Sequence, residues 1–324
     1  MNTFESRINL ASPLEKLAEA VCSHYKLGEF KGCKLIEIGY EDYNFILWAD
    51  DKKYLVKALS TFRNDEDCFN LAQRAVTAYD NGISCPKIYK IDGQNIGHVK
   101  LDNEIFRIIV MDFIDGKDFY SMEVLPDENE LKIIATELAK LNNIDFQPPF
   151  IYDHWAIINF EKEYKENIHF VKGEFKDLID KVYEKYLSID MNNLKHGFVH
   201  GDIIVTNIIK EKATGKLFFI DFSVSNYQPR IVDLAVSICD LCLDCDDIEL
   251  IKTRMQTFIN AYEQVSPLSD YEKSCLKVFL ATHQAITIIE TTREKFKNNN
   301  DSEENEDFLR KGQEGLKLVL SHLL

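Results

Sequence analysis

The sequence of 324 residues lacks the features that would direct it to a membrane or to nucleic acid. No apolar run reaches the roughly 20 residues that a membrane-spanning helix needs. The first ten residues are polar and charged, so we expect no signal peptide and a cytoplasmic protein. Basic residues are outnumbered, with 38 Lys and Arg against 54 Asp and Glu, a formal charge of −16. Because nucleic-acid binding depends on basic side chains that displace counterions, this balance excludes most nucleic-acid partners.

Internal repeats and long low-complexity tracts are also absent. The one segment with the composition of a disordered region is 297–307, with its Asn and Glu clusters. We expect it to form a loop between two C-terminal helices. The length and the 45% hydrophobic content are sufficient for a large core shared between two lobes.

Eight cysteines without a secretory signal predict free thiols in a reducing compartment. Cys239, Cys242 and Cys245 are spaced three residues apart, which raises the alternative of a metal site. Apolar residues between them indicate a buried helix, and no nearby fourth ligand completes a tetrahedral set. We therefore favour structural thiols over a metal site.

The most informative segment runs from His200 to Asp221. Asp202 follows a short apolar strand, and Asn207 comes five residues later, at the start of a second apolar strand. A polar turn over 210–216 then leads to a third strand that ends at Asp221, so the last two strands are expected to pair as a hairpin. Phosphoryl transfer from a nucleotide needs a carboxylate for the accepting hydroxyl and oxygen ligands for magnesium. These three residues supply such a set, and the alternative is a structural hairpin in which they only cap turns.

The order His-Gly-Asp-x-x-x-x-Asn, then Ile-Asp-Phe, then Asp-Leu-Ala at 233–235 resembles the aminoglycoside phosphotransferase and choline kinase superfamily. The resemblance implies an α+β, bilobal protein-kinase-like fold, with an N-terminal antiparallel sheet and a larger, mainly helical C-terminal lobe. It implies that Asp202 is the catalytic base, that Asn207 and Asp221 bind magnesium, and that Asp233 braces the catalytic loop. Gly201 and Ser223 depart from the Arg and Gly that protein kinases carry, which argues against a protein kinase. We expect His200 to be a packed anchor of the loop.

The N-terminal third carries a candidate nucleotide site. Lys57 lies within an apolar strand, where an unpaired ammonium would be costly to bury, and a nucleotide phosphate is its natural partner. The alternative is an edge-strand lysine in solvent. By resemblance, Gly39 and Asn44 line the phosphate pocket. The acid that pairs with Lys57 in relatives stays open between the positions of Glu66 and Gln73.

A candidate hinge follows the apolar strand over 105–111. By resemblance, residues 112–116 connect a nucleotide-binding lobe, 1–111, to a catalytic and substrate-binding lobe, 117–324. The remaining nucleotide-binding residues are then expected to be Met111, Asp112, Phe113 and Ile220. A plain turn between strand and helix is the alternative reading of the hinge. Asn142 ends a helix where the family pattern Leu-Ala-x-Leu-His has His.

These observations predict a magnesium-dependent kinase that transfers the γ-phosphate of ATP or GTP to a hydroxyl of a small molecule. The acidic chain favours a cationic acceptor such as an amino alcohol, a hydroxy amino acid or an aminoglycoside. A faint similarity to the homoserine kinase and hydroxylysine kinase branch points the same way. Acidic residues that could serve the acceptor cluster after the catalytic segment, at Asp240, Asp244, Asp246, Asp247 and Glu249. Glu290 is expected to be a surface or helix-pairing residue. The alternative function is a pseudokinase that binds nucleotide without turnover.

Overall fold

The structure, a computed structural model, describes residues 4–37, 42–243 and 247–323. The chain forms two compact units, one of residues 1–116 and 211–223, the other of residues 117–210 and 224–324. We call them unit 1 and unit 2. Within the described ranges, no helix combines the length and the apolar character needed to cross a bilayer.

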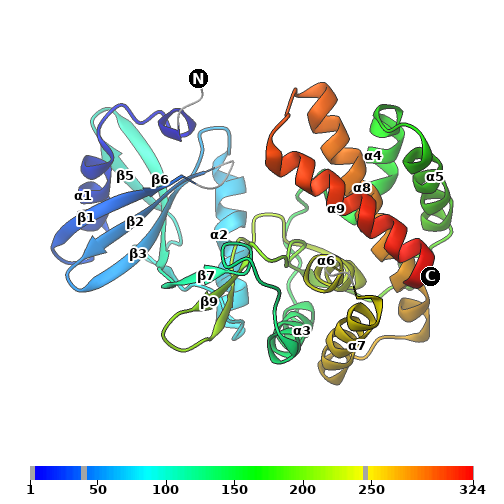
Figure 1. Cartoon of the computed structure of the whole chain (residues 1–324). Coiled ribbons are helices and arrows are strands. Elements are labelled where there is room, and N and C mark those ends of the chain that lie inside the picture. Colours follow the sequence, from blue (N-terminus) through cyan, green and yellow to red (C-terminus); the bar gives the residue numbers. More distant parts are fainter. Residues whose placement is uncertain (1–3, 38–41, 244–246, 324) are drawn as a thin grey trace. The chain divides into compact units, whose positions relative to one another are not determined.

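Unit 1 is built around an antiparallel sheet (Figure 1). Its strands run in the order β1-β2-β3-β6-β4, and β5 also pairs with β6. Their bounds are β1 Phe30–Ile36, β2 Tyr43–Ala49, β3 Lys52–Ala58, β4 Ile88–Tyr89, β5 Gly97–Leu101 and β6 Glu104–Asp112.

Two helices, α1 (Leu14–His24) and α2 (Asp65–Asp80), cover the sheet. Neighbouring residues of β6 point to opposite faces, as the strand period requires. Ile108 and Val110 pack with α1 in one apolar cluster, and Ile109 packs with α2 in another. Unit 1 is therefore three-layered, with α1 and α2 on opposite faces of the sheet.

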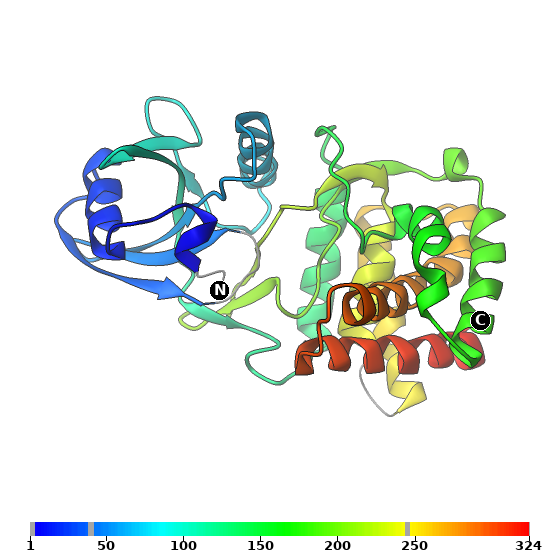
Figure 2. The same cartoon turned by 90° about the horizontal axis from the view of Figure 1, so that it is seen from above.

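Unit 2 is mainly helical, and its longest helix is α8, with 28 residues. Helices α4, α5, α6 and α9 all pack against α8, and α3 packs against α7. Figure 2 shows α8 and α9 lying alongside each other, in orange and red. The helices are α3 Glu128–Asn142, α4 Phe160–Asn167, α5 Glu174–Leu187, α6 Ile231–Cys242, α7 Ile248–Val265, α8 Asp270–Lys297 and α9 Glu303–Leu318.

Two small sheets hold the motif segments. One pairs β8 (His196–Val199) with β11 (Asn226–Pro229), and the other has the order β10-β9-β7. The bounds of the latter are β7 Gly116–Asp118, β9 Ile208–Glu211 and β10 Leu217–Phe219. The pairing of β9 with β10 confirms the predicted hairpin.

The loop that we expected over residues 297–307 is shorter in the structure. Helix α8 continues to Lys297, and α9 begins at Glu303. Ser302 caps α9 by accepting a hydrogen bond from the Asn305 amide at 3.2 Å, and acidic residues fill the first turn. Both features stabilise a helix N-terminus, so the polar composition reflects a capped helix start instead of disorder.

Candidate active site

Asp202 lies in a loop of unit 2 whose backbone is held from several sides. Asn207 donates from Nδ2 to the carbonyl of Asp202 at 3.0 Å and to its Oδ2 at 2.7 Å. The amide of Val205 donates to Oδ1 of Asp240 at 2.6 Å, which ties the middle of the loop to α6. Asp202 and Asn207 therefore come together as the sequence predicted, with the carboxylate oriented by an amide.

Buried Asp233 fixes the start of this loop. It accepts hydrogen bonds from the amides of His200 at 2.8 Å and Gly201 at 2.7 Å. Burial raises the pKa of Asp233 to about 6, and the hydrogen bonds from Gly201, Asn142 and His200 oppose that shift. His200 is fully buried, which confirms it as a packed anchor. Gly201 has φ +88°, a left-handed conformation in which a side chain would be strained.

The hydrogen bonds around Asp233 extend to two helices, α3 and α7, that the sequence analysis did not connect with the loop. Asn142 at the end of α3 donates from Nδ2 to Asp233 at 2.7 Å and to the carbonyl of Phe198 at 3.1 Å. Tyr262 of α7 donates to Oδ1 of Asn142 at 2.8 Å. All three polar side chains are buried, so every link is shielded from water. The departure from the family's His at 142 thus preserves a donor to the loop.

We expect Asn142→Ala to lower the free energy of unfolding by about 1–3 kcal/mol, because it leaves buried polar groups without partners. It should also lower turnover of the kinase expected from the sequence while the KM for nucleotide stays near the wild-type value, because the change affects the loop of Asp202 and leaves unit 1 intact. Asn142→His, which restores the family residue, should recover most of the turnover. Asn192→Ala, at an exposed position, is the control. Equal turnover in the wild type and Asn142→Ala would contradict this positioning role; steady-state kinetics and urea unfolding provide the measurements.

Asp221 belongs to unit 1, and it is exposed. Its φ is +62°, in the left-handed region that non-glycine residues seldom occupy. The amide of Ser223 donates to its Oδ1 at 3.2 Å. The preceding residue, Ile220, is half-buried. Asp50, Asp92 and Asp102 have the same left-handed conformation, so the backbone of Asp221 does not by itself mark a site.

Lys57 is nearly buried, with 15% of its side chain exposed, and its Nζ lies 3.8 Å from Oδ2 of Asp42. Asp42 also accepts from the Ser60 amide at 3.0 Å and lies 3.3 Å from Nε of Arg63. The partner of Lys57, which the sequence left open between the positions of Glu66 and Gln73, is Asp42 among the described residues. The sequence analysis did not consider Asp42, which directly precedes β2, as the partner of Lys57.

Asn44 lies directly opposite Lys57 in the register of β2 and β3. Its buried Oδ1 accepts no hydrogen bond from any residue that the structure describes. Such an orphaned oxygen beside a lysine fits a site that a ligand completes. Gly39, the other expected phosphate-loop residue, lies outside the described residues.

The expected hinge begins at the end of β6. Met111 pairs with both Leu55 and Ile88, so its backbone lies inside the sheet. Asp112 accepts from the Tyr89 hydroxyl at 2.7 Å and from the Lys87 amide at 3.3 Å. Phe113 is half-buried, and the Lys53 ammonium lies 5.4 Å from its ring centroid. The chain then enters β7, not a helix.

The acidic residues after the catalytic segment have local roles. Asp240 holds the Val205 amide, Asp247 caps α7, and Glu249 pairs with Lys252 on the surface. Asp244 and Asp246 lie outside the described residues. Asp240, Asp247 and Glu249 therefore make structural contacts within unit 2.

Cys239 and Cys242 are buried free thiols of α6, in keeping with structural thiols. Cys239 contacts the carbonyl of Leu280 at 3.6 Å. Burial raises the pKa of its thiol, which disfavours the thiolate that metals bind. Cys245 lies outside the described residues.

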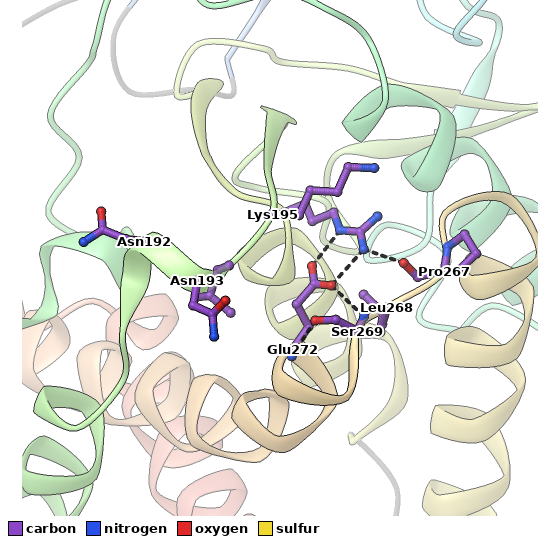
Figure 3. A pocket seen from close by; sticks show the side chains of 9 residues that line it. Asn192, Asn193, Lys195, Pro267, Leu268, Ser269 and Glu272 are labelled. Carbon is purple, nitrogen blue, oxygen red and sulfur yellow. Dashed lines mark hydrogen bonds and ion pairs between the residues drawn. The ribbon is translucent and has the colours of Figure 1, made fainter.

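Unit 2 also contains a hollow of about 590 Å³ beside a buried ion pair (Figure 3). Arg230 donates from Nε to Glu272 at 2.7 Å and from Nη2 at 2.9 Å. The same guanidinium donates to Ser266 and to the carbonyl of Pro267. Burial alone would raise the pKa of Glu272, but hydrogen bonds from Arg230 and Ser269 outweigh it and lower that pKa. Arg230 and Glu272 bind each other and neighbouring protein groups, so we interpret the side of the hollow that they form as structural.

Comparisons with known proteins identify the family. The model of the phosphotransferase enzyme family matches residues 32–268. The chain belongs to this family. It is thus a phosphotransferase of the aminoglycoside phosphotransferase and choline kinase kind, and the predicted family, fold class and enzyme class are confirmed.

Individual relatives are distant. A homoserine kinase of Rhodospirillum rubrum is 24% identical over 265 residues, 78% of this chain and 77% of that protein. The matches to three other curated relatives span only 26%, 40% and 47% of their lengths.

Solved structures share the fold. A spectinomycin phosphotransferase in complex with ADP and spectinomycin gives a TM-score of 0.66 at 14% identity, over 96% of this chain and 99% of that one. An amicoumacin kinase in complex with AMP-PNP and Ca²⁺ gives the same TM-score and identity, over 93% and 92%. At such identities the likeness concerns the fold alone.

Proposed function

We propose that this phosphotransferase moves the γ-phosphate of ATP or GTP to a hydroxyl of a small molecule, with Asp202 as the catalytic base. The observation that carries the proposal is the Asp202 carboxylate, held by Asn207 in a loop braced by Asp233 and Asp240. A fixed carboxylate of this kind can orient a hydroxyl and remove its proton as the oxygen attacks. The new bond joins that oxygen to the γ-phosphorus, the bond to the β-phosphate oxygen breaks, and a nucleoside diphosphate leaves.

The nucleotide is assigned to unit 1. Lys57 would neutralise phosphate charge, and Asn44, opposite it in the register of β2 and β3, would donate from Nδ2 to a phosphate oxygen. Gly39 would complete the phosphate loop. Met111, Asp112, Phe113 and Ile220 would surround the base and the sugar, as in the hinge of related kinases.

Magnesium is assigned to Asn207 and Asp221. Amide and carboxylate oxygens are the donors that magnesium prefers, and Asn207 uses its Nδ2 on Asp202, so its oxygen serves as the donor. When bound, the ion would neutralise charge on the phosphates. Asp221, with its left-handed backbone, would supply the carboxylate.

We propose an amino alcohol, a hydroxy amino acid or an aminoglycoside as the acceptor. The names of relatives include homoserine, choline and spectinomycin. The charge of −16 favours a cationic acceptor by long-range attraction.

A direct test measures magnesium-dependent consumption of ATP and GTP against these three acceptor classes. Turnover with one class, lost in Asp202→Ala, would support the proposal. Nucleotide binding without turnover against any acceptor would favour a pseudokinase.

The magnesium assignment has its own test. Asp221→Ala should abolish activity or raise the magnesium concentration needed for half-maximal turnover, because one carboxylate ligand is lost. Asp177→Ala, at an exposed position of α5, is the control. An unchanged magnesium dependence in Asp221→Ala would exclude Asp221 as a ligand; a magnesium titration at saturating nucleotide gives the answer.

A further inference from the structure

A second group of ionisable side chains lies in unit 2, outside the motifs. His154 precedes α4, Glu163 lies on α4, and Glu290 lies on α8, against which α4 packs. One ligand atom from each of the three falls within 4.8 Å of the others. Both glutamates are fully buried, so of the two places expected for Glu290, the surface or a helix pair, the structure excludes the surface.

Glu163 is held firmly in the ionised form. Its Oε1 accepts from the Tyr152 hydroxyl and lies 2.9 Å from Nδ1 of His154. Its Oε2 accepts from Nδ2 of Asn167 at 2.7 Å. Burial raises the pKa of Glu163, but the hydrogen bonds from Tyr152 and His154 outweigh it and lower the pKa. A fixed, buried carboxylate with a histidine at its side is therefore present before any ligand binds.

Glu290 is far less well satisfied. Neither of its oxygens accepts a hydrogen bond from the part of the chain that the structure describes. Nε of Arg293 lies 2.8 Å from Oε2, outside hydrogen-bonding alignment, and the same guanidinium also pairs with Glu294 at 2.7 Å. Burial raises the pKa of Glu290 to about 8; the guanidinium of Arg293 opposes this shift, and the carboxylate of Glu163 adds to it. At neutral pH Glu290 is therefore mostly protonated, and a metal ion that binds here must displace that proton.

We propose that His154, Glu163 and Glu290 form a site for a divalent transition metal such as Zn²⁺ or Mn²⁺. The donor set mixes one imidazole nitrogen with carboxylate oxygens, which suits these metals better than magnesium or calcium. Nδ1 of His154 and Oε1 of Glu163 lie 2.9 Å apart, against about 3.3 Å between donor atoms in a tetrahedral zinc site, so a bound ion would replace this hydrogen bond and separate the two atoms slightly.

The surroundings fit an ion that enters from solvent. Nearly half of the His154 side chain, 48%, is exposed, so one ligand faces water while two are buried. Glu290 and Glu294 share the guanidinium of Arg293, and Glu163 places a further carboxylate beside Glu290, so acidic groups outnumber the cation here. Lys162, whose ammonium lies 4.0 Å from the Tyr152 ring centroid, is exposed and therefore screened by water.

The test is a Zn²⁺ titration of the full chain by isothermal calorimetry without nucleotide, so that the proposed magnesium site lacks its phosphates. The wild type should bind one ion per chain at this site, and Glu290→Gln and His154→Ala should each weaken it by at least about 10-fold. Glu161→Gln, an exposed acid on the same helix as Glu163, is the control and should bind as the wild type does. Glu290→Gln keeps the volume of a buried side chain nearly constant, and His154 is exposed, so both variants are expected to fold.

Thermal unfolding gives a second readout. Zn²⁺ or Mn²⁺ should raise the Tm of the wild type and leave that of Glu290→Gln unchanged. Equal Zn²⁺ affinity in the wild type, Glu290→Gln and His154→Ala would overturn the proposal. A Tm shift with ethanolamine that depends on Glu290, without one for either metal, would overturn it in favour of an ammonium site. Neither result depends on turnover, so the proposed kinase activity is tested separately.

Discussion

Asp202→Ala is expected to lower turnover by at least about 100-fold, the lower range for the loss of a positioned general base. The carboxylate is fixed by Asn207 at 2.7 Å, and the loop that carries it is tied to α6 at two points, through Asp233 and Asp240. The Asp202 carboxylate is therefore already held in one position, and its removal should show its full effect on turnover. Rates should be measured by release of nucleoside diphosphate with the best acceptor at saturating magnesium.

Two further variants make this result interpretable. Asp202→Asn keeps a polar side chain of the same size and should lose nearly as much turnover, because an amide cannot take the proton. Glu184→Ala, on the exposed side of α5, should behave as the wild type does. A variant at Asp202 with the wild-type Tm and wild-type turnover would rule out this residue as the base.

Glu272→Gln is expected to lower the free energy of unfolding by about 3 kcal/mol, the lower part of the range for breaking a buried pair. The ion pair with Arg230 is almost completely buried, with 2% of each side chain exposed. Gln can retain the hydrogen bonds with Ser269 that cap α8, so the change isolates the loss of charge. The guanidinium of Arg230 would then remain buried without its carboxylate.

Urea unfolding followed by circular dichroism measures this loss. Glu249→Gln, in the exposed pair with Lys252, should change stability by less than about 0.5 kcal/mol. Replacing both partners, as Arg230→Met with Glu272→Leu, should recover most of the loss, because no charge is left buried alone. A Glu272→Gln protein as stable as the Glu249→Gln control would show that the pair contributes nothing.

The local parts of the candidate site could be predicted from the sequence. Asp202 and Asn207 lie five residues apart, so strand and turn patterns are enough to bring them together. The β9–β10 hairpin was likewise predictable, because a polar turn connects two short apolar strands. Short-range geometry of this kind needs no knowledge of the tertiary fold.

Long-range partners could not be predicted in this way. Asn142 and Tyr262 are 120 residues apart, and Arg230 and Glu272 are 42 apart, so no local pattern relates them. Asp42 was hidden for a different reason, because it stands in a turn whose composition indicates nothing about Lys57.

Polar residues were interpreted as solvent-exposed in two places. Glu290 was expected on the surface or between helices, and the structure excludes the surface and places it on α8, where α4 packs. The segment after Lys297 was expected to be a loop as far as 307, and α9 already begins at Glu303. In the second case Ser302 and the acidic first turn were a usable signal for a helix start.

The buried cysteines make the opening of each unit measurable by thiol alkylation. Only a thiolate reacts readily, and burial raises the pKa of Cys22 and Cys68 in unit 1 and of Cys239 in unit 2. These thiols should therefore resist alkylating reagents until the unit around them opens. Mass-spectrometric labelling rates at the three positions would time the unfolding of the two units separately, without an introduced probe.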